Sequence, residues 1–212
     1  MKPLVSRIAN RLFPIEAAQQ REYQDWEARD FAAPSPPYVK RTVLRRCGIP
    51  DAIWVETGTY LGDTTASLAG HARKVYTIEP DPTLFARARD RFSKSPTIEV
   101  LTGRSEDVLP GLLSRLSGDV CFWLDGHYSA GVTHKGPKDT PILEELDAIE
   151  AVQTRLKRLC VLIDDVRCFD PRQPDFRDYP SKTYLTQWAE RLSLDWHIEH
   201  DIFIAKRSLP NP

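Results

Sequence analysis

The fold is decided by residues 53–65, which read Ile53-Trp54-Val55-Glu56-Thr57-Gly58-Thr59-Tyr60-Leu61-Gly62-Asp63-Thr64-Thr65. An apolar run ends in an acid, two glycines follow, and hydroxyl residues then open a helical stretch. This order is typical of a β-strand that passes through a tight turn into the N-terminus of a helix. Such a turn lets the backbone approach a ligand closely and directs free N–H groups toward it.

A second acid lies where the same kind of site needs one. The apolar run that begins at Lys74 ends in Glu79, 21 residues after Gly58, and Pro80 follows it. In a doubly wound sheet, an acid at the end of the second strand binds the hydroxyl groups of a ribose. The two stretches together predict a site for a cofactor that contains a nucleoside.

These residues resemble the first motif of the class I S-adenosylmethionine-dependent methyltransferases. That motif is an acid followed by Gly-x-Gly-x-Gly, and the chain matches it at the acid and at two of three glycines, with Tyr60 in place of the middle one. The resemblance implies that the turn lies along the methionine part of the cofactor, that Glu79 binds the ribose and that Ser105 lies near the adenine. For Ser105, a plain helix cap is the alternative. The expected cofactor-binding residues are Glu56, Thr57, Gly58, Thr59, Tyr60, Gly62, Thr64, Thr65, Glu79, Pro80, Ser105 and Asp125.

The remaining sequence alternates apolar strands with amphipathic helices, which requires a parallel sheet covered on both faces. We expect an α/β fold with a doubly wound, seven-stranded, mostly parallel sheet and an antiparallel C-terminal hairpin. The expected strands are 53–56, 74–79, 98–101, 120–124, 159–163, 194–200 and 201–206, and the expected helices are 40–46, 63–71, 83–94, 105–116, 140–157 and 184–192. The cofactor-binding domain spans 39–207, between an N-terminal helical arm (1–38) and a short tail (208–212). The arm is expected to pack on the domain, to form a homodimer with a second subunit, or to cover the substrate.

Three acids follow two neighbouring strands. Asp125 ends the strand 120–124, and Asp164 with Asp165 ends the strand 159–163. The ends of neighbouring strands lie roughly 5 Å apart, so the three carboxylates are expected to converge. Carboxylates that converge need protons or a cation to neutralise them, and Mg²⁺ prefers such oxygen ligands. The arrangement resembles the metal-dependent O-methyltransferases of the catechol and macrocin groups, in which the metal holds two substrate oxygens. Paired acids that cap loops or contact the cofactor are the alternative.

His127 and Asp125 are the candidate catalytic residues. His127 follows the acid of the fourth strand, and its unperturbed pKa near neutrality suits a general base. A histidine that makes a structural hydrogen bond in a loop is the alternative.

The composition narrows the partners and the compartment. The 29 basic and 30 acidic residues leave a net charge of −1, which predicts no nucleic-acid partner. No apolar run approaches the roughly 18 residues that cross a bilayer, so no membrane partner is expected and the cytoplasm is the default location. The four cysteines form no C-x-x-C. Cys121 and Cys160 lie inside apolar strand-like runs and are expected to be buried free thiols, since a zinc site would need a tighter cluster.

The predicted function is therefore transfer of a methyl group from S-adenosylmethionine to a small molecule, at a hydroxyl group and with help from Mg²⁺. A protein that keeps the fold as a binding or assembly module without turnover is the main alternative, since fold alone does not establish activity. A nicotinamide-dependent oxidoreductase is disfavoured, because Gly58 to Gly62 does not supply the Gly-x-Gly-x-x-Gly of that class.

Overall fold

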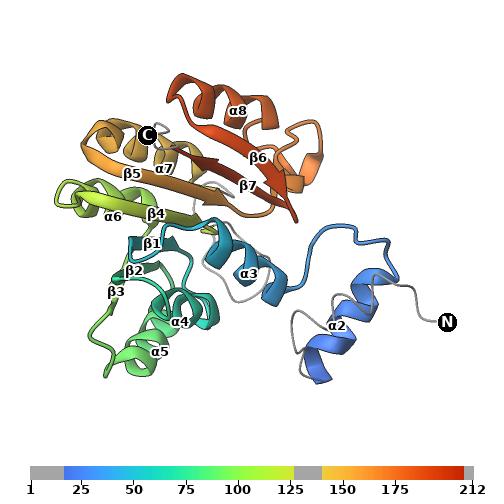
Figure 1. The fold of residues 1–212 in the computed structure, drawn as a ribbon, viewed down its shortest axis with the longest axis horizontal. Coiled ribbons are helices and arrows are strands. Elements are labelled where there is room, and N and C mark those ends of the chain that lie inside the picture. Colours follow the sequence, from blue (N-terminus) through green and yellow to red (C-terminus); the bar gives the residue numbers. More distant parts are fainter. Residues whose placement is uncertain (1–16, 127–139, 208–212) are drawn as a thin grey trace.

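The computed structural model describes residues 17–126 and 140–207. The strands are β1 (Ile53–Thr57), β2 (Lys74–Glu79), β3 (Ile98–Thr102), β4 (Gly118–Leu124), β5 (Leu156–Ile163), β6 (Asp195–Glu199) and β7 (Ile202–Lys206). They form one sheet in the order β3-β2-β1-β4-β5-β7-β6 (Figure 1). Strands β1 to β5 pair in parallel, and β7 pairs antiparallel with both β5 and β6. The predicted fold class is thus confirmed.

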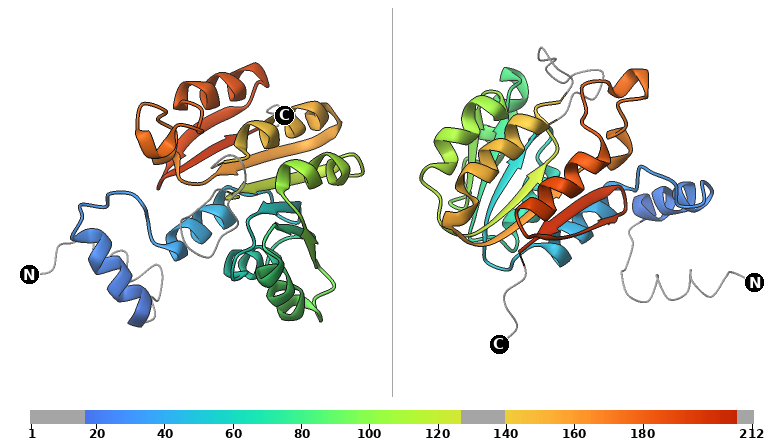
Figure 2. Two further views of the ribbon diagram at one scale, coloured as in Figure 1. Left: turned by 180° about the vertical axis from the view of Figure 1, so that it is seen from behind. Right: turned by 90° about the horizontal axis from the view of Figure 1, so that it is seen from above.

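Helices cover both faces of this sheet (Figure 2). They are α3 (Pro37–Cys47), α4 (Asp63–Ala69), α5 (Pro82–Phe92), α6 (Ser105–Leu113), α7 (Ile142–Val152) and α8 (Lys182–Arg191). The remaining helix, α2 (Ala17–Glu27), lies to one side of the sheet, beyond α3 (Figure 1). Successive strand residues point to opposite faces, so Phe122 packs in one core with Leu109 of α6 and Cys121 in the other with Leu44 of α3. Burial on both sides explains why the strands read as unbroken apolar runs.

The helix expected over 140–157 is shorter in the structure. α7 ends at Val152, a 3₁₀ turn spans Gln153–Arg155, and β5 begins at Leu156. Leu156 is buried in the core and pairs with Gly118 at the start of β4. Burial of this leucine in the sheet outweighs the helical pattern, so Arg155 and Lys157 lie beyond the end of α7.

The predicted helix cap at Ser105 is wrong. Arg104 is the N-cap of α6 and makes no side-chain capping bond, and Ser105 is the buried first residue of the helix. The hydroxyl therefore lies inside the helix start and does not flank it.

The described part of the arm packs on the domain of the same chain. Trp26 of α2 is buried, and its ring meets those of Phe31 and His200 at centroid distances of 5.1 and 5.5 Å. The Ser35 hydroxyl donates to the carbonyl oxygen of His200, 3.1 Å away. These contacts fix the arm to the turn between β6 and β7.

Two further sequence predictions can be compared with the described residues. Cys121, Cys160 and Cys168 are buried free cysteines and Cys47 is half-buried and free. In 17–126 and 140–207, no helix has the length and apolar character to cross a membrane.

Candidate active site

A cavity of about 450 Å³ opens at the carboxyl ends of β1, β4 and β5. This is the edge where doubly wound sheets bind their ligands, beside the point at which the strand order reverses. The volume lies in the range of small-molecule sites. Of the residues expected from the sequence, the cavity is lined by Gly58, Thr59, Tyr60, Gly62, Thr64, Asp125, Asp164 and Asp165.

The turn after β1 brings the backbone to this edge. Gly58 has a φ of +85°, and a Cβ added to it would lie 2.5 Å from the carbonyl oxygen of Asp125. Only glycine therefore allows the turn to pass so close to the end of β4. Gly62 also has a positive φ, of +83°, and it precedes the first residue of α4.

Glu56 lies beneath this turn and does not line the cavity. Its Oε2 accepts hydrogen bonds from Thr65 and Thr77 at 2.5 and 2.7 Å, and its Oε1 is buried with no partner among the described residues. Burial raises the pKa of Glu56 to about 7. The carboxyl group thus ties α4 to β1 and β2, and its second oxygen remains open to a donor.

Glu79 lies at the end of β2, as expected, and it is nearly buried. Its two carboxylate oxygens accept hydrogen bonds from the amide groups of Tyr60 at 2.8 Å and of Asp81 at 3.0 Å. Burial raises its pKa above the ordinary value. The amide of Thr59 also contributes a hydrogen bond to this carboxylate. A carboxylate offers about four acceptor positions, so Glu79 can still accept from a hydroxyl of a ribose.

The other expected residues either do not line the cavity or lie outside the described part of the chain. Thr57, Thr65, Glu79, Pro80 and Ser105 are not among the residues that line the cavity. The Thr57 hydroxyl accepts from the amide of Asp125 at 3.2 Å and holds the ends of β1 and β4 together. His127 lies outside the described residues.

Lys40 is the main feature that the sequence did not predict. Its Nζ lies 2.6 and 2.7 Å from the two carboxylate oxygens of Asp164 and 3.0 Å from Oδ1 of Asp165. The lysine side chain is 14% exposed and lines the cavity. Although burial alone would lower the pKa of Lys40, the two aspartates raise it above the usual value. The ammonium is the cation of this acid pair.

The same contacts argue against the magnesium site that the sequence predicts at Asp125, Asp164 and Asp165. Lys40 engages both oxygens of Asp164, and Arg167 also pairs with Asp165 at 2.5 Å. A hard divalent ion needs these oxygens for itself, so the arrangement does not fit Mg²⁺. Burial and the neighbouring Asp165 raise the pKa of Asp164 to about 6. No sequence signal joins Lys40 to acids 124 residues away.

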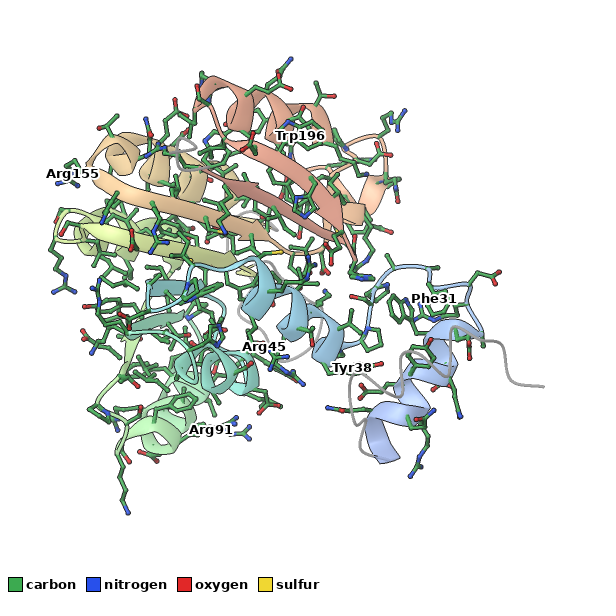
Figure 3. The ribbon with its side chains drawn as sticks, in the orientation of Figure 1. Phe31, Tyr38, Arg45, Arg91, Arg155 and Trp196 are labelled. Carbon is green, nitrogen blue, oxygen red and sulfur yellow. The ribbon has the colours of Figure 1, made fainter. Side chains whose placement is uncertain are left out.

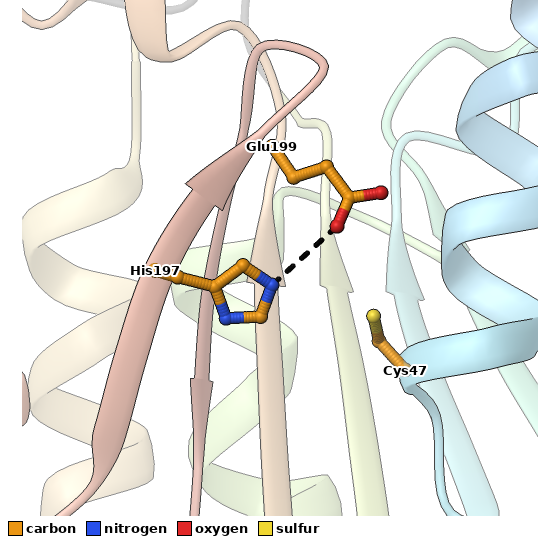
Figure 4. Close-up of side chains that lie close together, drawn as sticks. All are labelled: Cys47, His197 and Glu199. Carbon is orange, nitrogen blue, oxygen red and sulfur yellow. Dashed lines mark ion pairs between the residues drawn. The ribbon is translucent and has the colours of Figure 1, made fainter.

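Among the described residues, a different group of side chains lies close enough together to bind a metal ion. Cys47, His197 and Glu199 bring one ligand atom each within 4.8 Å of one another (Figure 4). Arg46 forms an ion pair with Glu199, however, and the ammonium of Lys206 donates to the Cys47 carbonyl oxygen at 3.1 Å. Positive groups thus already surround the cluster and oppose a further cation.

Comparison with known proteins supports the fold. A putative caffeoyl-CoA O-methyltransferase from Staphylococcus aureus aligns at a TM-score of 0.54 and 13% identity, over 89% of this chain and 91% of that one. The N-methyltransferase NodS from Bradyrhizobium japonicum aligns at 0.52 and 17%, over 80% and 93%. The chain has the fold of the class I methyltransferases. No protein-family model matches the sequence.

One curated relative corrects the expected partners. The probable ribosomal RNA small subunit methyltransferase A of Methanosarcina acetivorans is 38% identical over 95 residues, which cover 41% of this chain and 35% of that protein. The chain thus spans about a third of the length of the curated relative it matches. The expectation of no nucleic-acid partner was therefore wrong. It was drawn from a net charge of −1, which is a sum over the whole chain and hides local groups of basic residues such as Arg41, Arg45 and Arg46 on α3.

Proposed function

We propose that the chain is an S-adenosylmethionine-dependent methyltransferase. The observation that carries the proposal is the cavity formed by the Gly58 turn and the end of β4, next to the carboxylate of Glu79 at the end of β2. A close glycine turn fits the methionine part of the cofactor, and the buried carboxylate fits its ribose.

We further propose a hydroxyl group of a small molecule as the methyl acceptor. In an O-methylation, the acceptor oxygen loses its proton to a base and attacks the methyl carbon, and the carbon–sulfur bond breaks to leave the thioether of S-adenosylhomocysteine. Asp125 lines the cavity and offers a carboxylate to take the proton. His127, two residues beyond Asp125, is the other candidate base. No step is assigned to a metal, because Lys40 holds the acid pair.

An RNA acceptor is the second candidate. It is favoured by the identity with a protein described as a ribosomal RNA methyltransferase and by the arginines of α3. A mixture of hydroxylated small molecules and a small-subunit ribosomal RNA, offered with labelled S-adenosylmethionine, separates the two acceptors. The same assay with EDTA tests the metal, and label in RNA alone would contradict the small-molecule acceptor while keeping the enzyme class.

The cofactor is tested by calorimetric titration of S-adenosylhomocysteine and of NAD⁺ into the wild type and Glu79→Ala. Loss of charge-assisted ribose contacts is expected to weaken S-adenosylhomocysteine about ten- to a hundredfold. Glu190→Ala, at an exposed glutamate of α8, is the matched control and should bind as the wild type does. A preference for NAD⁺, or equal affinities in both variants, would contradict the proposed site. Tight binding without transfer to any acceptor would favour a module without turnover.

A further inference from the structure

A second cavity lies between the arm and the domain. It measures about 720 Å³ and is lined by residues of α2, of α3 and of the turn that joins β6 to β7. We propose that this cavity is the acceptor subsite and that it binds the phosphate or diphosphate group of a small organic acceptor. The inference rests on the proposed methyltransferase function and names the chemical class of its substrate.

The charges on its wall favour an anion. Three arginines line the cavity, Arg41, Arg45 and Arg46, against one acid, Glu199. Arg46 forms an ion pair with Glu199, whereas Arg41 and Arg45 have no acidic partner at ion-pair distance in the part of the chain that the structure describes. Arg41 and Arg45 are four residues apart and so lie on the same face of α3. Two guanidinium groups on one wall suit the oxygens of a phosphate.

A hydrogen-bonding group on the same wall also lacks a partner. The Tyr38 hydroxyl is buried, and no described atom forms a hydrogen bond with it. Figure 3 shows Tyr38 at the end of α3 that faces α2, with Arg45 farther along the same helix. Burial raises the pKa of Tyr38, and the nearby charge of Glu22 raises it further. Glu22 itself does not line the cavity. A buried hydroxyl without a partner is costly, and a ligand oxygen would satisfy it.

The remaining walls suit the organic part of such a ligand. Tyr23 and Trp26 of α2 line the cavity opposite the arginines, and aromatic walls favour ring-bearing ligands. Arg41 lines both this cavity and the one that holds the proposed cofactor site. A molecule bound by its phosphate near Arg45 can therefore extend past Arg41 toward the cofactor.

The size of the cavity suits a small molecule. A volume of about 720 Å³ lies within the range of small-molecule sites. Beyond the cavity, α2 carries Glu22, Asp25 and Glu27 against the single basic residue Arg21. None of these three acids lines the cavity, so its wall keeps three arginines against one acid.

The test is a titration of uridine diphosphate, with uridine as its uncharged counterpart, into the full chain in the presence of S-adenosylhomocysteine. Arg45→Gln and Tyr38→Phe are the variants, since neither residue lines the cofactor cavity. Arg177→Gln, at an exposed arginine far along the chain, is the matched control. We expect the diphosphate to bind and uridine not to, and Arg45→Gln to weaken the diphosphate about tenfold or more. S-adenosylhomocysteine should bind all variants alike.

Three results would overturn the inference. They are equal binding of uridine and its diphosphate, no effect of either variant on the diphosphate, and a small-subunit ribosomal RNA fragment that binds more tightly than the diphosphate and is weakened by the same variants. The proposed function is read separately in the same samples. If S-adenosylhomocysteine fails to bind while the diphosphate binds as expected, the cofactor assignment fails and the anion site remains.

Discussion

Glu56 shows how one residue can serve the site without touching its cavity. Its carboxyl group is fully buried beneath the Gly58 turn, and burial raises its pKa to about 7 from an ordinary 4.5. The folded state therefore binds the proton more tightly than the unfolded state does. The stability that Glu56 contributes is complete below about pH 4.5 and is lost as the pH rises through 7.

Replacement of this acid should remove that part of the pH dependence. We expect Glu56→Gln to gain stability relative to the wild type between pH 5 and pH 8, by up to roughly 3 kcal/mol at the upper end. Urea unfolding at several pH values measures the difference. For the control Glu190→Gln, at an exposed position, the free energy of unfolding should change with pH as it does for the wild type. If the same holds for Glu56→Gln, the burial of Glu56 is not linked to its protonation.

Sequence reasoning at this scale was accurate where a residue type is imposed by backbone geometry. Gly58 and Gly62 have the positive φ angles that the turn requires, and Glu79 ends β2. It was less accurate where a role depends on distant partners. Nothing near Lys40 in the sequence points to its ion pair with Asp164. Serine is a residue type that helix caps prefer, but Arg104 and not Ser105 is the N-cap of α6.

At the scale of the element, the turn from β1 to α4 depends on its glycines more than on its length. A methyl group on Gly58 would meet the carbonyl of Asp125 at 2.5 Å, so the end of β4 would have to move. We expect Gly58→Ala to destabilise the protein by at least about 2 kcal/mol and to weaken S-adenosylhomocysteine. Thermal unfolding and titration measure the two effects.

Gly111 of α6 is the matched control for this substitution. A Cβ added there meets no atom within 4 Å, and the residue lies in an exposed helical position. Gly111→Ala should stabilise the protein by about 0.5–1 kcal/mol, because alanine loses less chain entropy in a helix. Equal losses from both substitutions would mean that the close approach to β4 is not what selects glycine at position 58.

The elements themselves were predictable because each was signalled by its own pattern. The apolar runs gave all seven strands, with β2 matching its predicted bounds of 74–79. α7 was predicted too long because the residues after Val152 fit a helix as well as a strand. Leu156 is buried in the core and pairs with Gly118 of β4, which favours the strand.

At the scale of the whole molecule, Lys40 joins the N-terminal part of the chain to the end of β5. Lys40→Met leaves Asp164 without its ammonium, and we expect a loss of about 2–3 kcal/mol at pH 8. The pKa of Asp164 is already raised to about 6, so its carboxyl takes up a proton as the pH falls. The loss should shrink below pH 6, and unfolding curves at pH 5 and pH 8 measure this.

Lys74→Met is the matched control for the pair. Lys74 and Glu99 form an ion pair of 3.2 Å in which the side chains are 28% and 43% exposed, so its loss should cost within about 1 kcal/mol at either pH. The double variant Lys40→Met with Asp164→Asn should recover part of the loss. A cost for Lys40→Met that is the same at both pH values would contradict an ionic role for this lysine.

The arrangement of the sheet could be predicted as a whole, whereas the cavity between the arm and the domain could not. Alternating strands and helices with a closing hairpin fix the doubly wound order. The second cavity depends on how α2 packs beside α3 through Trp26 and His200, two residues that are 174 positions apart in the chain. No local pattern encodes that contact.

The position of α3 between the two cavities has a thermodynamic consequence. Arg41 contributes to both walls, so any displacement of this helix by one ligand alters the cavity of the other. The two affinities are then coupled, and the factor by which the first ligand changes the second must equal the factor by which the second changes the first. A change in α3 would therefore be seen in the affinities of both ligands, even if only one of them touches the altered residue.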